Sequence, residues 1–197
     1  MQRTLPMRRS ADIPSRLPLH HLPGFLALLL LFFICIHLPI QNFRIQGHSM
    51  EPTLHDQEFV LVNKAAYVLQ PPARGDIIVF QYPRNPQESY IKRIIAIPGD
   101  VISIDGQTVT VDGVRLHEPY VNKQDSFNPY TAIKKHIVAP NQYFVMGDNR
   151  GNSSDSRQWG LVPRDNILGK AVLIYWPPAN NIGFLADPVD VFARVHQ

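Results

Sequence analysis

The chain has 197 residues, 45% of them hydrophobic and 18% charged, and its formal net charge is +3. Its single cysteine, Cys35, excludes a fold stabilised by internal disulfide bonds, so a hydrophobic core must hold the chain together. The eight histidines are scattered and form no Cys/His cluster with the spacing of zinc ligands, so no metal site is expected.

A stretch without any charged residue runs from Leu22 to Ile40 and is wholly apolar over residues 25–36. As a helix, residues 22–40 would be about 28 Å long at ~1.5 Å per residue, close to the ~30 Å thickness of a bilayer core. We therefore predict a transmembrane anchor helix over residues 22–40. A cleavable signal peptide and a buried core helix are the alternatives. The first lacks a small-x-small cleavage site at Gln41–Arg44, and the all-round apolarity argues against the second.

The distribution of charge predicts the orientation of this anchor. Residues 1–21 contain four arginines opposed only by Asp12, so the whole net charge lies there. The positive-inside rule then makes residues 1–21 a cytoplasmic tail and residues 41–197 an extracytoplasmic domain of a single-pass protein in the plasma (inner) membrane. The isoelectric point of about 9.1 reflects this tail. A basic arm that binds nucleic acid would leave the apolar stretch unexplained, so no nucleic-acid partner is expected.

Residues 41–197 are predicted to form one mostly β domain, a folded antiparallel sheet or a barrel-like structure. The 18 prolines of the chain argue against long helices. Residues 64–69 are compatible with one short helix, and the polar residues 117–140 indicate a surface excursion. Hairpin turns are expected at residues 105–106 and 112–113, both Asp-Gly. Short runs of β-branched and aromatic residues predict strands at 58–63, 76–81, 90–97, 101–104, 108–111, 143–146 and 167–174.

Two polar residues of this domain indicate nucleophilic chemistry: Ser49 and, 43 residues later, Lys92 within an apolar run. A serine hydroxyl needs a base, and His48 is adjacent, but neighbouring side chains of an extended strand point to opposite faces, so His48 is predicted to be a bystander. A lysine serves as the base only when neutral. Burial among residues 90–97, and to a lesser degree the charge of Arg93, would lower its pKa from ~10.4. On local sequence alone, an exposed strand lysine remains the open alternative.

Four sequence blocks place this pair in a wider pattern. They resemble, in order and spacing, the four boxes of type I signal peptidases (leader peptidases), which are serine peptidases with a Ser/Lys dyad. The resemblance extends from residue 22 to about residue 170. The blocks are Ser49-Met50-Glu51-Pro52-Thr53, Arg74-Gly75-Asp76-Ile77-Ile78-Val79-Phe80, Tyr90-Ile91-Lys92-Arg93-Ile94 with Ile97-Pro98-Gly99-Asp100, and Gly147-Asp148-Asn149-Arg150-Gly151-Asn152-Ser153-Ser154-Asp155-Ser156-Arg157 with Trp159-Gly160.

The resemblance implies a role for each matching position. Ser49 matches the nucleophile, Lys92 the general base and Ser153 the serine that orients the lysine amine. The backbone N–H of Ser49 matches one oxyanion donor. The second donor stays unassigned because Gly47 stands where many members have serine. A charged cluster that supports the site in the family matches Arg93, Asp155 and Arg157. The residues that line shallow substrate pockets in the family match Ile45, Met50, Leu54, Val79 and Ile91, although these apolar residues would equally serve as ordinary core.

The same resemblance implies a membrane-bound serine endopeptidase that removes signal peptides, with small residues before the cut, from exported preproteins. It needs no cofactor and no metal, and its partners are the preproteins and the lipid bilayer. Its fold would be a catalytic domain of coiled antiparallel β-sheets. Lys92 and Gly147 are only 55 positions apart, so the second domain of larger members would be reduced to a hairpin and loop.

Three alternatives remain open. A specialised peptidase of the same superfamily would mature pilins in conjugation or act in the mitochondrial inner membrane. A non-catalytic, membrane-anchored β module would keep the pattern without the activity. A self-cleaving Ser/Lys repressor is a weaker rival, because it would be soluble and carry a DNA-binding domain. The apolar residues 175–178 and 184–185 are expected either to touch the bilayer or to pack on the sheet.

Overall fold

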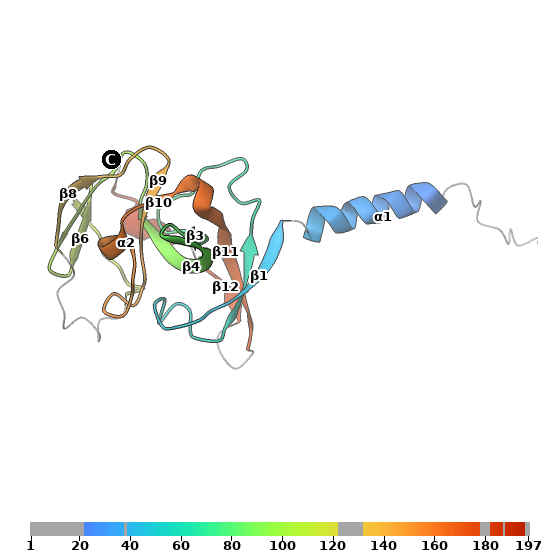
Figure 1. The fold of residues 1–197 in the computed structure, drawn as a ribbon, viewed down its shortest axis with the longest axis horizontal. Coiled ribbons are helices and arrows are strands. Elements are labelled where there is room, and N and C mark those ends of the chain that lie inside the picture. The colour runs from blue at the N-terminus through green and yellow to red at the C-terminus, as the bar shows by residue number, and fades with distance from the viewer. Residues whose placement is uncertain (1–21, 38, 122–131, 178–181, 187, 196–197) are drawn as a thin grey trace, which may run out of the picture. The chain divides into compact units, whose positions relative to one another are not determined.

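The computed structural model describes residues 22–37, 39–121, 132–177, 182–186 and 188–195. The chain divides into two units, Met1–Leu38 and Pro39–Gln197 (Figure 1). The predicted cytoplasmic tail, residues 1–21, lies outside the described residues.

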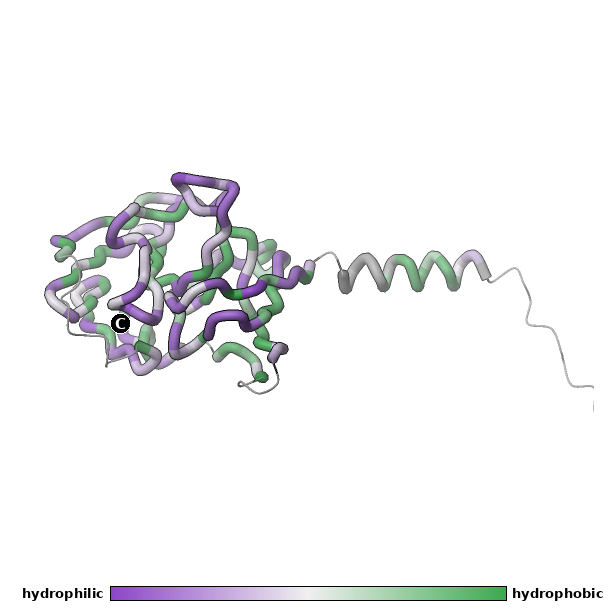
Figure 2. The backbone as a smooth tube through the Cα atoms, turned by 60° about the horizontal axis from the view of Figure 1, so that its bottom comes forward, coloured by the Kyte–Doolittle hydropathy of each residue, from purple (hydrophilic) through white to green (hydrophobic). Residues whose placement is uncertain are grey.

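The first unit contains the helix α1 (Leu22–His37), which begins where the sequence predicts and ends before Ile40. A proline disfavours helical conformation in the residue before it, so Pro39 accounts for the earlier end. Large apolar side chains of α1 are exposed, Leu28 and Phe32 among them, and the middle turns of the helix are coloured as hydrophobic in Figure 2. Among the described residues, no helix has the combination of length and apolarity needed to cross a membrane.

The second unit is mostly β, as predicted, and every pairing between its described strands is antiparallel. Its larger sheet has the order β1-β2-β11-β3-β4-β9-β10, with β12 paired to β11. The strands of this sheet are β1 (Ile40–Arg44), β2 (Phe59–Asn63), β3 (Ile77–Tyr82), β4 (Asn85–Ala96), β9 (Gln142–Met146), β10 (Val162–Pro163), β11 (Ile167–Trp176) and β12 (Gly183–Phe184).

A smaller sheet with the order β7-β6-β5-β8 lies in the chain between β4 and β9. Both Asp-Gly hairpin turns are confirmed, and positive φ angles at Asp112 (49°) and Gly113 (79°) show why the second turn needs these residues. This part is larger than the predicted hairpin and loop, because residues 117–140 contain a fourth strand; residues 122–131 lie outside the described part. The strands are β5 (Val101–Asp105), β6 (Thr108–Val111), β7 (Val114–Arg115) and β8 (Ile133–Ile137).

Short helical turns complete the unit: α2 (Ser156–Trp159), η2 (Arg164–Asn166) and α3 (Val189–Phe192). Residues 64–69 form turns and not the helix considered above. Buried apolar side chains form three clusters, one against the smaller sheet and two against the larger. Met50 and Leu54, which follow the nucleophile candidate, lie in one of these clusters with Val60 and Val62 of β2. This packing fixes the loop that carries Ser49.

Candidate active site

Ser49 lies in the connection between β1 and β2, where the chain reverses direction. Gly47 has a φ of +93°, a conformation that favours glycine. The turn is closed by a hydrogen bond from the Leu54 N–H to the Met50 carbonyl (2.9 Å). Since Met50 and Leu54 are buried, they anchor the turn in the core and leave the Ser49 side chain at the surface of a groove.

Lys92 comes from β4, where it pairs with Ile78 of β3. Its Nζ donates to the Ser49 Oγ at 2.7 Å and to the Ile91 carbonyl at 2.9 Å. The side chain is only 4% exposed, so the open alternative of a solvent-directed lysine does not describe this structure. The structure thus brings together the two residues singled out in the sequence.

Burial lowers the pKa of Lys92 from 10.5 to about 8, although the carboxylates of Asp155 and Asp148 act in the opposite direction. The expected contribution of Arg93 to this shift is not found. Its guanidinium is paired with Asp148, which neutralises its charge. A larger fraction of Lys92 is therefore neutral near pH 8 than in a solvated lysine.

His48 does not reach the nucleophile. Its exposed ring points to Glu51, with 2.8 Å between Nδ1 and Oε1, and that contact raises the pKa of His48. No hydrogen bond joins its ring to Ser49 among the described residues. The Gly47 N–H is also engaged, since it donates to Asp56 Oδ1 at 2.7 Å. The second oxyanion donor therefore stays unassigned.

Ser153 lies beside the nucleophile, but its hydroxyl donates to Asp155 Oδ2 (2.8 Å) and not to Lys92. A Cβ placed on Gly147 would lie 2.3 Å from both Ser153 Oγ and the Ser49 carbonyl oxygen, which shows how closely these segments approach. The buried Asp155 also accepts from the Gly147 N–H (3.0 Å) and is paired with Arg157 through Nε and Nη2 (2.7 Å each). Asp155 thus holds the Ser153 hydroxyl and the strand end at Gly147 together.

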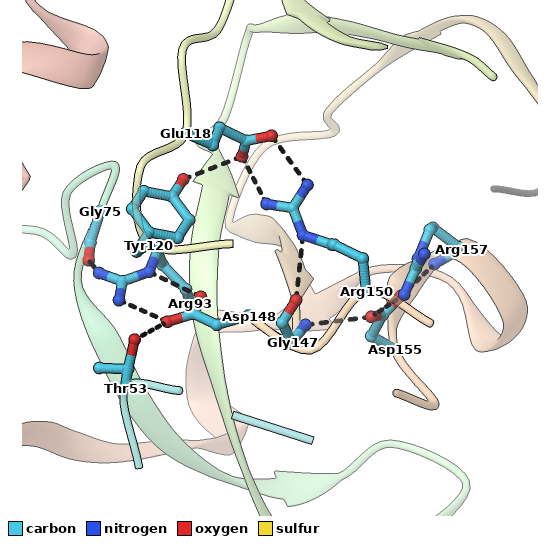
Figure 3. A network of polar contacts seen from close by, with 10 residues as sticks. All are labelled: Thr53, Gly75, Arg93, Glu118, Tyr120, Gly147, Asp148, Arg150, Asp155 and Arg157. Carbon is cyan, nitrogen blue, oxygen red and sulfur yellow. Dashed lines mark hydrogen bonds and ion pairs between the residues drawn. The ribbon is translucent and has the colours of Figure 1, made fainter. Parts of the chain in front are cut away.

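Arg93 belongs to a second buried ion pair, and its partner is Asp148 (Figure 3). The guanidinium donates from Nε and Nη2 to the two carboxylate oxygens, at 2.9 and 2.6 Å, and from Nη1 to the Gly75 carbonyl at 2.9 Å. Thr53, four residues after the nucleophile, donates to the same carboxylate at 2.5 Å. The predicted charged cluster is therefore two separate pairs. Asp148 and Thr53 both lie in the sequence blocks quoted above but had been given no role.

A groove with a volume of about 610 Å³ passes Ser49 and Lys92. Three of the five predicted pocket residues line it: Ile45, Val79 and Ile91. Met50 and Leu54 do not, because both side chains are on the core side of the turn. Lining residues that the sequence did not indicate are Phe43, Arg44, Gln46, Gln87, Glu88, Ser89, Tyr90 and Ser154.

Unpaired strand edges border this groove. β9 pairs with β4 only over residues 93–96, whereas residues 85–92 pair with β3 alone among the described strands. Among the strands that the structure describes, β1 pairs with β2 alone and forms the end of the sheet. The backbone beside Ser49 and Lys92 is therefore available to an extended peptide, which can add to such an edge as a further strand.

A serine hydroxyl bonded to a buried lysine of lowered pKa, at a groove beside unpaired strand edges, is the arrangement expected of a serine peptidase whose base is a lysine. Residues 19–176 match the family described as signal peptidase, peptidase S26. The chain therefore belongs to this signal peptidase family, and it is a serine peptidase that cleaves signal peptides.

Relatives of the chain cover most of its length. A probable signal peptidase I-1 of Synechocystis sp. is 38% identical over 189 residues, which is 92% of this chain and 91% of the relative. A probable signal peptidase I-2 of the same organism is 38% identical over 151 residues, or 74% and 67% of the two chains. Signal peptidase I of Aquifex aeolicus is 35% identical and covers 77% of this chain and 81% of the relative. A crystal structure of a signal peptidase I from Enterococcus faecalis is 33% identical, with a TM-score of 0.43 over 51% of this chain and 97% of that one.

Proposed function

We propose that Ser49 and Lys92 are the catalytic dyad of this peptidase and that the enzyme acts at a membrane on exported preproteins. The observation that carries the proposal is the 2.7 Å hydrogen bond between the Lys92 Nζ and the Ser49 Oγ, with the lysine side chain buried. The relatives reported above are named as signal peptidases I and not as pilin-maturation or mitochondrial enzymes, so the specialised alternative is not favoured.

The chemistry follows from this geometry. Neutral Lys92 accepts the Ser49 proton while the Oγ attacks the scissile carbonyl, and the backbone N–H of Ser49 stabilises the oxyanion. The lysine then gives its proton to the leaving amine of the product. The neutral Lys92 amine next takes a proton from a water molecule, which hydrolyses the ester. The Ser153 hydroxyl donates to Asp155 and so keeps its lone pairs for a further hydrogen bond, which in this proposal the lysine ammonium donates. Asp155 is occupied by its ion pair with Arg157, which suits a supporting role and not that of the base.

The substrate is an extended segment with small residues before the cut. Its backbone would pair with the free edge of β4, and its side chains would enter the groove beside Ile45, Val79 and Ile91. These branched side chains leave shallow space, which favours alanine-sized groups.

The membrane association is supported by residues 22–40, which contain no charged residue, and by the exposed apolar side chains of α1. In this proposal residues 1–21 are cytoplasmic, residues 22–40 form the anchor, and residues 41–197 form the extracytoplasmic peptidase domain in the plasma (inner) membrane. Trp176 and Phe184, on the paired strands β11 and β12, are 53% and 85% exposed. Exposed aromatic side chains are favourable at the interface between headgroups and water, so this region is a contact with the bilayer beside the substrate.

The test is cleavage of a preprotein in detergent by the full chain and by two variants, Ser49→Ala and Lys92→Met. Each removes one member of an interdependent pair, so each should lower kcat by about 10³-fold or more. Circular dichroism should show both variants folded. His48→Ala is the matched control, because His48 is adjacent to the nucleophile but points away from it, and this variant should keep its activity. Near wild-type turnover by Lys92→Met would show that the base is a different group.

A further inference from the structure

Glu118 and Tyr120, from the segment after β7, reach the polar network around Arg93 of β4 (Figure 3). The carboxylate of Glu118 accepts hydrogen bonds from both terminal nitrogens of Arg150, at 2.8 Å from Nη1, and from the Tyr120 hydroxyl at 2.9 Å. The ring of Tyr120 lies over the Arg93 guanidinium, 4.1 Å from its carbon to the ring centroid. We refer to Glu118 and Tyr120 together as the clamp.

Both arginines that the clamp contacts hold the same turn, residues 147–150. Arg93 binds Asp148 through two hydrogen bonds, and the Nε of Arg150 donates to the Gly147 carbonyl at 3.0 Å. Residues 147–150 also hold the nucleophile loop, which is the connection between β1 and β2 that carries Ser49. The Asn149 N–H donates to the Ser49 carbonyl and its side-chain amide donates to the His48 carbonyl, both at 3.1 Å. A continuous series of contacts therefore joins the clamp to the main chain of Ser49.

Glu118 supplies a carboxylate to the buried Arg150 in this network. The side chains of Arg93, Arg150 and Asp148 are almost fully buried, and that of Glu118 is 9% exposed. Loss of the Glu118 charge would remove this ion pair from the buried Arg150, which is close enough to Arg93 to lower the pKa of Arg93. The Tyr120 ring covers a face of the Arg93 guanidinium and keeps water from it, which strengthens the pair with Asp148. Burial raises the pKa of Tyr120 well above its usual range, so its hydroxyl remains a donor.

We propose that Glu118 and Tyr120 are positioning residues of the peptidase: they fix the turn at residues 147–150, and the turn fixes Ser49 against Lys92. This inference rests on the proposed dyad. The clamp touches neither substrate nor the reacting atoms, so it acts through geometry. A misplacement of about 1 Å of a catalytic group is enough to lower the rate by as much as ~10²-fold. The smaller sheet thus contributes to catalysis through the segment that leaves β7.

The experiment measures kcat, KM and the pH dependence of preprotein cleavage by the full chain in detergent. Tyr120→Leu removes the ring, and Glu118→Gln removes the charge that balances Arg150. Each should lower kcat by about tenfold or more with KM little changed. Tyr120→Phe keeps the ring over Arg93 and should restore most of the rate. Val111→Ala, in the buried core of the smaller sheet, is the control for general destabilisation.

The acidic limb of the pH profile is the range in which the rate rises as Lys92 loses its proton. Its position distinguishes a positioning role of Glu118 and Tyr120 from a merely structural one. The groups that face Lys92 are Ser49, the carboxylates of Asp148 and Asp155, and the ring of Tyr90 at 5.6 Å. When the turn loosens, water reaches Lys92 and the limb of Tyr120→Leu should move to higher pH. Val111→Ala should leave the limb in its wild-type position.

Wild-type kcat and an unmoved limb in both Tyr120→Leu and Glu118→Gln would overturn the inference. So would a loss in those variants that Val111→Ala reproduces at an equal drop in melting temperature. Ser49→Ala and Lys92→Met are run in parallel. If they remain active, the proposed dyad is wrong. If they are inactive while the clamp variants behave as wild type, only the clamp is wrong.

Discussion

At the scale of single residues, the site depends on a lysine that the fold keeps away from water. The Lys92 ammonium is less stable in the buried position than in solvent, and that difference makes the neutral amine accessible. Asp148 and Asp155 limit the effect, because their charges favour the ammonium. Their own pairing with Arg93 and Arg157 reduces this opposition. The two ion pairs therefore influence the base as well as the shape of the site.

The pH dependence of cleavage tests this balance. Since the active form of Lys92 is neutral, the rate should rise as pH increases through the pKa of about 8 and level off above it. A solvated lysine would place this acidic limb near ~10.4. Histidine titrates near ~6.5 and is the main source of a false limb, so the profile should be repeated with His48→Ala. A limb that disappears in that variant while activity persists would assign the base to the wrong residue.

At the scale of elements, the turn that follows β9 is packed so closely that it has no space for a larger side chain at Gly147. Gly147 is needed there for close approach and not for a left-handed conformation, because a Cβ would meet backbone and side-chain atoms at 2.3 Å. The turn lies where the nucleophile loop, the Asp155 carboxylate and the two arginines meet.

Gly147→Ala should therefore abolish most of the activity, since the methyl group forces Ser49 or Ser153 away. A shift of about 1 Å in a catalytic group is enough to lower kcat by as much as ~10²-fold. Gly183→Ala is the matched control: nothing lies within 4 Å of a Cβ at that glycine, which is in β12. The measurement is kcat for both variants together with their melting temperatures. Equal activities would show that the site tolerates displacement of the turn.

Strands with a clear apolar pattern in their own sequence could be predicted. Strands that form only because a neighbouring strand pairs with them could not. Residues 59–63 and 101–105 alternate between buried and less buried positions, which a local pattern reveals. β1 and β8 are mostly exposed edge strands, and β7, β10 and β12 have two residues each, so their pairing depends on the sheet around them. Element boundaries shifted for the same reason.

The site shows the same division. The sequence pattern predicts that Ser49 and Lys92 act together, and the structure places the Lys92 Nζ 2.7 Å from the Ser49 Oγ. The direction of Met50 and Leu54, into the core and not the groove, is set by packing against β2. The partner of the Ser153 hydroxyl depends on where Arg157 holds Asp155. Glu118 is 32 residues from Arg150 in the sequence, and nothing local to either residue indicates that they meet.

At the scale of the whole molecule, the chain is asymmetric in charge. All of its net positive charge precedes the apolar stretch. In the proposed orientation, the positive-inside rule keeps this charge on the cytoplasmic side. The proposed orientation places the peptidase domain on the side to which a preprotein is exported, in agreement with the proposed function.

Protease added to spheroplasts tests this orientation. It should digest residues beyond 41 and spare residues 1–21, since the arginines of the tail remain on the cytoplasmic side. After lysis the tail should become sensitive, which shows that it was protected by the membrane and not by folding. Protection of the C-terminal part in intact spheroplasts would reverse the assigned topology.

The order in which the chain is synthesised determines when the contacts of the site can form, because these contacts join residues that are far apart in the sequence. Ser49 and Lys92 are 43 residues apart, and the loop of Ser49 is held by Asn149, which is 101 residues from His48. Contacts of such separation form only after the segments between them have left the ribosome and closed their loops. A nascent chain that ends before β9 lacks Asn149, and with it the two hydrogen bonds that hold the loop of Ser49. In the proposed topology, the apolar N-terminal stretch would therefore reach the membrane before the site of the same chain is complete.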